Sequence, residues 1–230
     1  MAERFFVETA IASTQVVLTG DEAHHLARVM RASVGDLLWL FDGSGIDYQA
    51  RIVSLRKQAV ELEIVHKQPG RVGHQQLSLA VALPKGDRQH WLVEKLTELG
   101  VGKLIPLQTE RSVASAAQAK ERLKRWSIEA CKQCQRSDLL EIAPPTSLSE
   151  LIAQTDEQTQ KFVAHPGGEP LTTIRPQTSS LLAIGPEGGF SDDEVALLQT
   201  AQFAQVSLGS LILRVETAAI AAAVWLGAER

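Results

Sequence analysis

A chain of 230 residues is long enough for one large domain or for two modest ones, each with its own core. Its hydrophobic share of 44% and aromatic share of 5% are ordinary for a globular protein and exclude a disordered or fibrous architecture. No stretch reaches the roughly 18 uninterrupted apolar residues of a membrane span, and the N-terminus lacks the pattern of a secretory signal. We therefore expect a cytoplasmic protein without a membrane segment.

The net charge of −4 is distributed unevenly along the chain. Residues 84–136 carry 11 Lys and Arg against 6 Asp and Glu, whereas residues 137–230 carry 4 against 12. A local basic face is enough to follow a phosphate backbone, whatever the net charge. An ordinary solvated helix surface is the alternative interpretation, and charge alone does not decide between the two.

The first 70 residues predict a small β-barrel with one helix. Short strand-like runs with partial alternation of apolar and polar residues lie at 5–7, 15–18, 37–41, 47–53 and 59–65. Thr19 and Glu22 have the spacing of a capping box, which predicts a helix over residues 23–31. The turn-forming residues 68–73 predict a linker after the barrel.

The rest of the chain predicts alternating strands and helices, typical of a mostly parallel sheet covered by helices. Strands are expected at 77–83, 103–107, 161–164, 180–184 and 204–208, and helices at 88–99, 117–135, 149–154, 191–201 and 215–227. The second of these helices would carry Cys131 and Cys134 one turn apart. Because no second pair of ligands follows, we interpret them as reduced thiols and expect no metal.

The first candidate site follows the apolar strand 181–184, where a glycine-rich turn over 185–189 leads into a helix. Ser191 and Glu194 at the start of that helix have the spacing of a second capping box. Ligands of α/β sheets bind at such strand ends, and glycines leave no side chain between backbone and ligand. Glu187, the one acid of the turn, argues against phosphate and suits a ligand with positive charge or ribose hydroxyls. An ordinary glycine turn is the alternative.

The second candidate site lies in residues 206–218, where a strand again ends in a glycine turn. Arg214 and Glu216 then open an alanine-rich helix. Unpaired charges beside so apolar a region are costly, so the two residues could form a mutual ion pair that caps the helix. Glu216 is also favourable near a helix N-terminus without any ligand.

The two glycine segments together carry a family resemblance. I-G-P-E-G-G-F-S at residues 184–191 and L-G-S-L-I-L-R-V-E-T-A at residues 208–218 resemble the bacterial 16S ribosomal RNA uridine-N3 methyltransferase family of the SPOUT superfamily. The resemblance covers nearly the whole chain. Residues 4–7 and 24–31 are similar to the family's PUA-like domain, and residues 95–101 and 110–112 to its K-x-x-E-L-G-V and E-R-S signatures. Two places depart from the family pattern, residues 131–136 and the pair Ser210-Leu211.

This resemblance implies an α/β protein with two domains. A PUA-like RNA-binding β-barrel would occupy residues 1–70, and a SPOUT domain with a trefoil-knotted, mostly parallel sheet would occupy residues 74–230. It also implies S-adenosyl-L-methionine as cofactor, 16S ribosomal RNA of the small ribosomal subunit as partner, and a homodimer. Carried over residue by residue, the implied cofactor-binding residues are Leu182, Gly185, Glu187, Gly188, Gly189, Leu208, Gly209, Ile212 and Leu213, with His165 as a further candidate.

The implied reaction requires side chains that stabilise charge and accept a proton. Methyl transfer from a sulfonium depends on holding donor and acceptor atoms in line, and N3 of uracil carries a proton at neutral pH. We therefore expect Arg214 to stabilise the negative charge that develops on a uracil carbonyl oxygen. Glu216 or Glu187 would orient Arg214 or accept the proton. The residues expected to contact RNA are Arg28, Arg31, Arg111 and Arg136; His24 and His25 could stack on RNA, bind phosphate or be structural histidines.

Two other functions stay open at this point. A PUA-like assembly factor with a vestigial pocket would bind RNA without binding the cofactor and without catalysis. A SPOUT methyltransferase could also act on another RNA, such as transfer RNA, or on a ribose hydroxyl. The sequence identifies neither the target nucleotide nor whether the substrate is free RNA or an assembled subunit.

Overall fold

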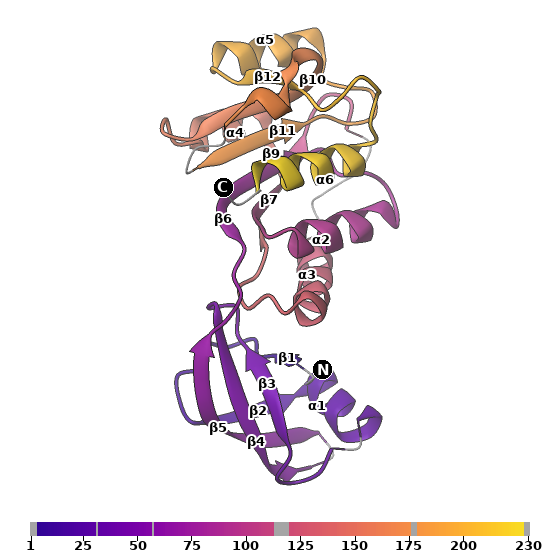
Figure 1. The fold of residues 1–230 in the computed structure, drawn as a ribbon. Coiled ribbons are helices and arrows are strands. Elements are labelled where there is room, and N and C mark those ends of the chain that lie inside the picture. Colours follow the sequence, from indigo (N-terminus) through magenta and orange to yellow (C-terminus); the bar gives the residue numbers. More distant parts are fainter. Residues whose placement is uncertain (1–3, 31, 57, 113–119, 176–178, 228–230) are drawn as a thin grey trace. The chain divides into compact units, whose positions relative to one another are not determined.

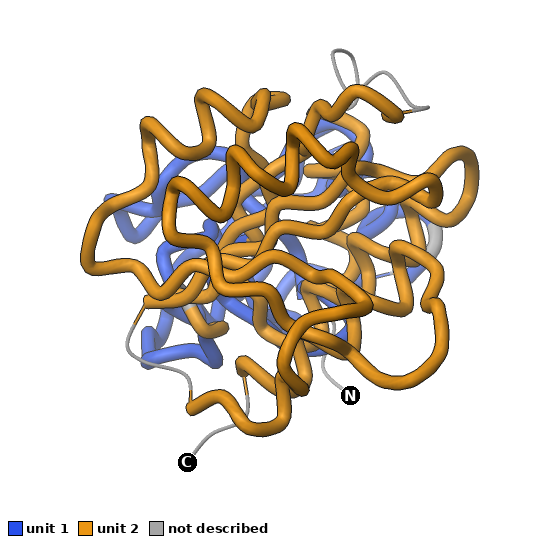
Figure 2. Tube along the Cα trace, turned by 90° about the horizontal axis from the view of Figure 1, so that it is seen from above, with its two compact units in different colours: residues 1–72, 131–139 blue, residues 73–130, 140–230 orange. Residues whose placement is uncertain are grey.

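The computed structural model describes residues 4–30, 32–56, 58–112, 120–175 and 179–227. The chain divides into two compact units (Figure 2). Unit 1 contains residues 1–72 and 131–139, and unit 2 contains residues 73–130 and 140–230. No helix in the described part of the chain is long and apolar enough to cross a membrane.

Unit 1 is built on a curled five-stranded sheet in the order β1-β3-β4-β5-β2 (Figure 1). Its strands are β1 (Arg4–Phe6), β2 (Gln15–Thr19), β3 (Leu37–Phe41), β4 (Ile46–Leu55) and β5 (Ala59–Pro69). β1 runs parallel to β3, and the other neighbours are antiparallel. Because β1 and β2 form the two edges, the barrel expected from the sequence is open along one side.

The helix of unit 1 differs from its prediction. α1 (Gly20–His24) passes directly into a π-helical turn, η1 (His25–Val29), and Ala23 and Leu26 pack into the core of the sheet. The predicted capping box is wrong, because the Thr19 side chain makes no capping hydrogen bond. Glu22, its expected partner, forms an ion pair with Lys132 instead.

Residues 131–139 join unit 1 although they are distant in sequence. The Arg4 guanidinium pairs with Asp47 (Nη2 to Oδ1, 2.7 Å) and donates to the carbonyl oxygen of Gln135 (3.1 Å). The hydroxyl of Ser137 donates to the same Asp47 oxygen at 2.6 Å. Gly70 leaves room for this approach, since a Cβ there would lie 2.1 Å from Ser137 Oγ. A polar network therefore attaches the returning segment to the sheet.

Arg136 lies in this segment, and we expect its replacement by alanine to destabilise unit 1. Its side chain is 4% exposed and forms a two-point ion pair with Asp138, Nε to Oδ1 and Nη2 to Oδ2, both 2.9 Å. Removing one partner of a buried pair costs about 3–5 kcal/mol, measurable as a lower urea midpoint. Arg56→Ala is the control, because its ion pair with Glu61 is exposed and worth at most about 1 kcal/mol. Equal losses in the two variants would contradict this prediction.

Unit 2 contains a sheet in the order β12-β10-β11-β6-β7-β8, with β9 also paired to β7. All described pairs are parallel, as predicted. The strands are β6 (His74–Val81), β7 (Val101–Gln108), β8 (Glu141–Ile142), β9 (Thr146–Ser147), β10 (Gln160–Pro170), β11 (Ser180–Ile184) and β12 (Ala204–Ser207). The helices are α2 (Arg88–Glu98), α3 (Lys120–Cys134), α4 (Leu148–Gln154), the 3-10 turn η2 (Leu171–Thr173), α5 (Asp192–Thr200) and α6 (Val215–Leu226).

Helices cover both faces of the central strand β11, which is buried throughout. Leu182 and Ile184 point into a core that includes residues of α2 and α6, whereas Leu181 and Ala183 point into a second core with α4 and α5. Side chains that alternate between two covered faces explain why this strand is a continuous apolar run. Because β6, β10, β11 and β12 are parallel, the segments that follow them leave the sheet at one edge.

Candidate active site

A cavity of about 710 Å³ lies at this carboxyl edge of the sheet in unit 2. Both glycine segments line it, although they are separated by α5 and β12 in the sequence. The predicted residues that line the cavity are Gly185, Glu187, Gly189, Leu208, Gly209, Ile212, Leu213 and His165. The structure therefore brings the two candidate sites together into one.

Two predicted cofactor-binding residues stand elsewhere. Leu182 is fully buried in β11 and belongs to the core on the α2 and α6 side. Gly188 faces Arg111, and a Cβ at this glycine would lie 3.4 Å from Arg111 Cδ. Neither residue is among those that line the cavity.

The first glycine segment is held in a tight turn. The amide of Gly189 donates to the carbonyl oxygen of Pro186 at 2.8 Å, and Gly189 has a φ of +69° that favours glycine. The predicted capping box at the start of α5 is confirmed, since Ser191 accepts from the Glu194 amide and Glu194 accepts from the Ser191 amide. The turn therefore ends at a fixed helix start.

Hydrogen bonds from the E-R-S signature, residues 110–112, also hold this turn. Glu194 also accepts a hydrogen bond from the amide of Glu110 at 2.8 Å. The Arg111 guanidinium donates to the carbonyl oxygen of Gly188 at 2.8 Å. Arg111, which we expected to contact RNA, thus contacts the backbone of the first glycine segment.

We expect Arg111→Ala to weaken binding of S-adenosylhomocysteine, the demethylated form of the expected cofactor. A hydrogen bond from a charged donor contributes about 1.5–3 kcal/mol, so loss of the Gly188 contact should lower affinity by about tenfold or more. Calorimetric titration without RNA measures this effect. If Arg111 acted on RNA alone, the affinity for the nucleoside would be the same in the variant and the wild type.

The charged residues of the site pair differently from the expected ion pair. Arg88, at the start of α2, pairs with Glu187 (Nη2 to Oε1, 2.9 Å) and with Glu216 (Nη1 to Oε2, 3.6 Å). Arg214 is exposed at the N-cap of α6, and its side chain makes no hydrogen bond or ion pair with the described residues. The mutual pair of Arg214 and Glu216 is therefore wrong.

Arg88 pairs with a residue that lines the cavity, Glu187, and was not predicted from the sequence as a functional residue. It was expected only as the first residue of a helix. Its position in the sequence could have identified it, because Arg88 follows the turn after β6, and β6 pairs with β11. The amide of Ala82 donates to the carbonyl oxygen of Ile184 at 2.9 Å, so the segments that follow the two strands begin side by side.

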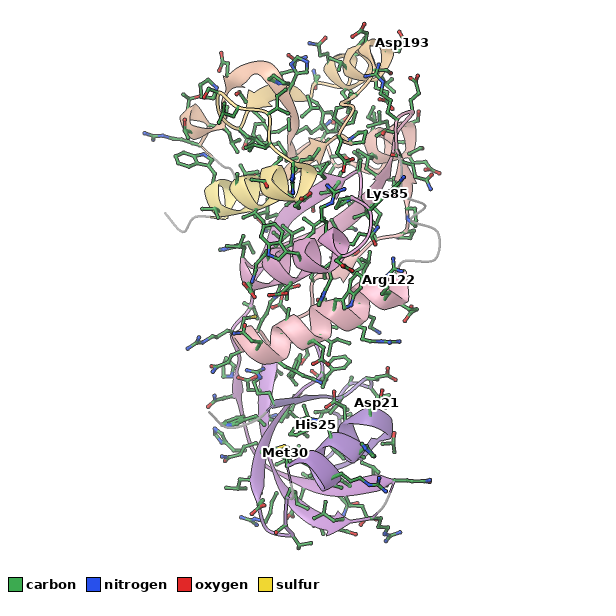
Figure 3. All side chains as sticks on the ribbon, turned by 90° about the vertical axis from the view of Figure 1, so that its right-hand side faces the viewer. Asp21, His25, Met30, Lys85, Arg122 and Asp193 are labelled. Carbon is green, nitrogen blue, oxygen red and sulfur yellow. The ribbon has the colours of Figure 1, made fainter. Side chains whose placement is uncertain are left out.

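The remaining predicted RNA contacts have different surroundings. Arg28 is exposed on η1, Arg31 lies outside the described residues, and Arg136 is buried in its pair with Asp138. His24 is exposed, and the ring of His25, labelled in Figure 3, lies 6.2 Å from that of Phe5 between centroids.

The basic stretch 84–136 contains several cations with local partners. Lys95, in the K-x-x-E-L-G-V signature, pairs with Glu94 (2.8 Å) and Glu98 (3.0 Å). Hydrogen bonds to these two carboxylates raise the pKa of Lys95 above its usual value. Arg122 (Figure 3) donates to Gln89 Oε1 at 2.9 Å and lies over the ring of Trp126. Part of the positive charge thus stabilises the surface of α2 and α3.

Cys131 and Cys134 both lie on α3 as thiols rather than in a disulfide, in agreement with the prediction. Cys131 is buried, and its thiol donates to the carbonyl oxygen of Asp138 at 3.4 Å. Among the described residues, no group of three or more His, Cys, Asp or Glu side chains could hold a metal ion.

Models of RNA methyltransferase domains match residues in both units of the chain. Residues 72–227 match the model of an RNA methyltransferase domain, and residues 18–65 match that of an RNA methyltransferase PUA domain. The chain is 34% identical to ribosomal RNA small subunit methyltransferase E of Synechocystis sp., over 95% of this chain and 75% of that protein.

Two solved structures are similar over almost their whole length. Ribosomal RNA small subunit methyltransferase E from Neisseria gonorrhoeae bound to S-adenosyl methionine has a TM-score of 0.86 and 29% identity, covering 97% of this chain and 96% of that one. A putative methyltransferase of Legionella pneumophila in complex with the cofactor has a TM-score of 0.89 and 30% identity, covering 98% and 97%. The predicted fold class, a SPOUT α/β domain preceded by a PUA-like domain, is confirmed.

Proposed function

Because the chain belongs to the ribosomal RNA small subunit methyltransferase E family, we propose that it methylates N3 of a uridine in 16S ribosomal RNA. S-adenosyl-L-methionine is the methyl donor. The observation that carries this proposal is that both glycine segments and Glu187 meet in one cavity. Arg214, whose side chain has no partner among the described residues, directly follows Leu213 of the cavity lining.

The residues around the cavity fit this cofactor. A volume of about 710 Å³ is within the range of small-molecule sites. Leu208 and Leu213 offer apolar surface to an adenine ring, and the glycines expose backbone groups for its polar atoms. Glu187 offers a carboxylate to ribose hydroxyls or to positive charge. When bound, the cofactor supplies a methyl group activated by its sulfonium.

Arg214 is the residue that we assign to the uracil. As the N3 proton leaves, negative charge spreads to the neighbouring carbonyl oxygens of the base. An exposed guanidinium that pairs with no other described side chain can donate to such an oxygen, and its effect is largest where charge develops during the reaction. The N-cap position of Arg214 fixes its backbone at the end of the second glycine segment.

The two carboxylates have different roles in this proposal. The side chain of Glu187 is 38% exposed and lines the cavity, so a substrate proton can reach it. Glu216 is 4% exposed and lies inside the start of α6. We therefore assign proton acceptance to Glu187 and a structural role to Glu216.

Substrate binding and assembly complete the proposal. Arg28 and Arg31 of the PUA-like domain would contact ribosomal RNA in the cytoplasm, and two copies of the chain would form a homodimer. Leu211 and Ile212 are 79% and 93% exposed at the cavity. A second copy could cover such apolar side chains, since exposed apolar surface of this kind commonly marks an interface.

Transfer from labelled S-adenosyl-L-methionine tests the proposed function. Unmodified small ribosomal subunits, free 16S ribosomal RNA and transfer RNA would be compared as acceptors, and the modified nucleoside identified by mass spectrometry. We expect 3-methyluridine in 16S ribosomal RNA. A methylated ribose or labelled transfer RNA would favour the other SPOUT activities, and nucleoside binding without any transfer would favour the assembly factor.

A further inference from the structure

Arg88 connects three segments that leave the same edge of the sheet. It begins α2 after β6, its partner Glu187 lies in the first glycine segment after β11, and its partner Glu216 lies in the first turn of α6. α2 and α6 pack against each other, and both pack into the core on one face of the sheet (Figure 1). One guanidinium therefore links the first glycine segment to the start of α6.

Of the two ion pairs that Arg88 forms, the one with Glu216 costs more free energy to break. Glu216 is 4% exposed, and its Oε2 atom has no hydrogen-bond partner in the part of the chain that the structure describes. That same atom lies 3.6 Å from Arg88 Nη1. A buried carboxylate that loses its cation is strongly unfavourable, so the position of Arg88 and that of the start of α6 depend on each other.

Arg214 lies two residues before Glu216 and caps the same helix. Resting on the proposed function, we infer that Arg88 is a positioning residue for methyl transfer. Through Glu187 it holds the first glycine segment, and through Glu216 it holds the helix start that places Arg214 toward the base. Arg88 itself contacts neither the base nor the methyl group in this assignment.

Single-turnover methyl transfer to small ribosomal subunits, with cofactor and RNA saturating, tests the inference in several variants. Arg88→Gln should slow transfer by about 10- to 100-fold, the effect of a displacement of about 1 Å at the reacting groups. Arg88→Lys should recover most of the rate because it restores the charge. The double variant Arg88→Gln with Glu216→Gln should be faster than Arg88→Gln alone, because it removes the buried carboxylate that lacks a cation.

Lys103→Gln is the matched control, because Lys103 pairs with the exposed Glu141 near the start of β7 and should keep the wild-type rate. The RNA concentration at half-maximal rate gives a second readout. An arginine that bound phosphate would raise this value at an unchanged maximal rate, whereas a positioning arginine lowers the maximal rate. Three results would each overturn the inference. Arg88→Gln could change only the RNA concentration at half-maximal rate, or it could transfer at the wild-type rate. The double variant could also be no faster than Arg88→Gln alone.

Amide hydrogen exchange, measured without RNA or cofactor, separates this inference from the proposed function. Arg88→Gln should accelerate exchange at residues 187–189 and in the first turn of α6, and Lys103→Gln should not. If the wild type transferred no methyl group, the proposed function would fail while this link between the segments could still be observed. Unchanged exchange in Arg88→Gln would overturn the link whatever the activity.

Discussion

Arg214→Ala should lower the single-turnover rate of methyl transfer by about 10²- to 10³-fold, the loss typical of removing one donor to a developing oxyanion. Its side chain is exposed at the N-cap of α6 and makes no hydrogen bond or ion pair with the described residues. Little of the fold should therefore depend on it. Rapid-quench measurements with saturating cofactor and small ribosomal subunits give the rate.

Binding of S-adenosylhomocysteine to Arg214→Ala should stay close to that of the wild type, because Arg214 is assigned to the base. Calorimetry on the same preparation provides this comparison, and Lys103→Ala controls for the loss of one positive charge in unit 2. A wild-type transfer rate in Arg214→Ala, with the nucleoside still bound, would remove the assigned role. A rate that fell only in proportion to cofactor affinity would move Arg214 to the cofactor site.

Gly185→Ala should weaken nucleoside binding by about 10- to 100-fold. A Cβ at this position would lie 3.1 Å from two ring atoms of Phe190 and 3.2 Å from its backbone nitrogen. The turn would have to open to accept it, and overpacking of this kind costs about 1–3 kcal/mol. Calorimetric titration with S-adenosylhomocysteine measures the change.

Gly167→Ala is the matched control for that experiment. A Cβ at Gly167 would meet the His165 ring at 3.4 Å, an ordinary contact that needs no rearrangement. Its affinity should therefore equal that of the wild type. If the two alanine variants bound the nucleoside equally well, the first glycine segment would not be the part of the cavity that holds it.

Local signals predicted the elements that position the site. Ser191 and Glu194 are three residues apart, and the capping box that they form depends on little beyond that spacing. The apolar run of β11 and the glycines after it likewise identify a buried strand with a ligand-binding end. Thr19 and Glu22 have the same spacing, but Thr19 makes no capping hydrogen bond, and Glu22 pairs with Lys132, more than a hundred residues away.

The contacts that could not be predicted from the sequence are mostly ion pairs that form only in the completed fold. Arg88 meets Glu187 and Glu216 only because parallel strand order brings the segments after β6, β11 and β12 to one edge. Arg136 looked like a basic residue available to RNA, yet a buried pair with Asp138 uses its guanidinium. Spacing along the chain carries no signal for such contacts, because they depend on the completed fold.

Amide hydrogen exchange with and without S-adenosylhomocysteine tests most directly whether the two glycine segments form one nucleoside site. Saturating ligand should slow exchange in both residues 185–190 and residues 208–213, with no comparable change at the amino ends of the strands. Protection of only one segment, or of neither while the ligand is demonstrably bound, would contradict a site built from both.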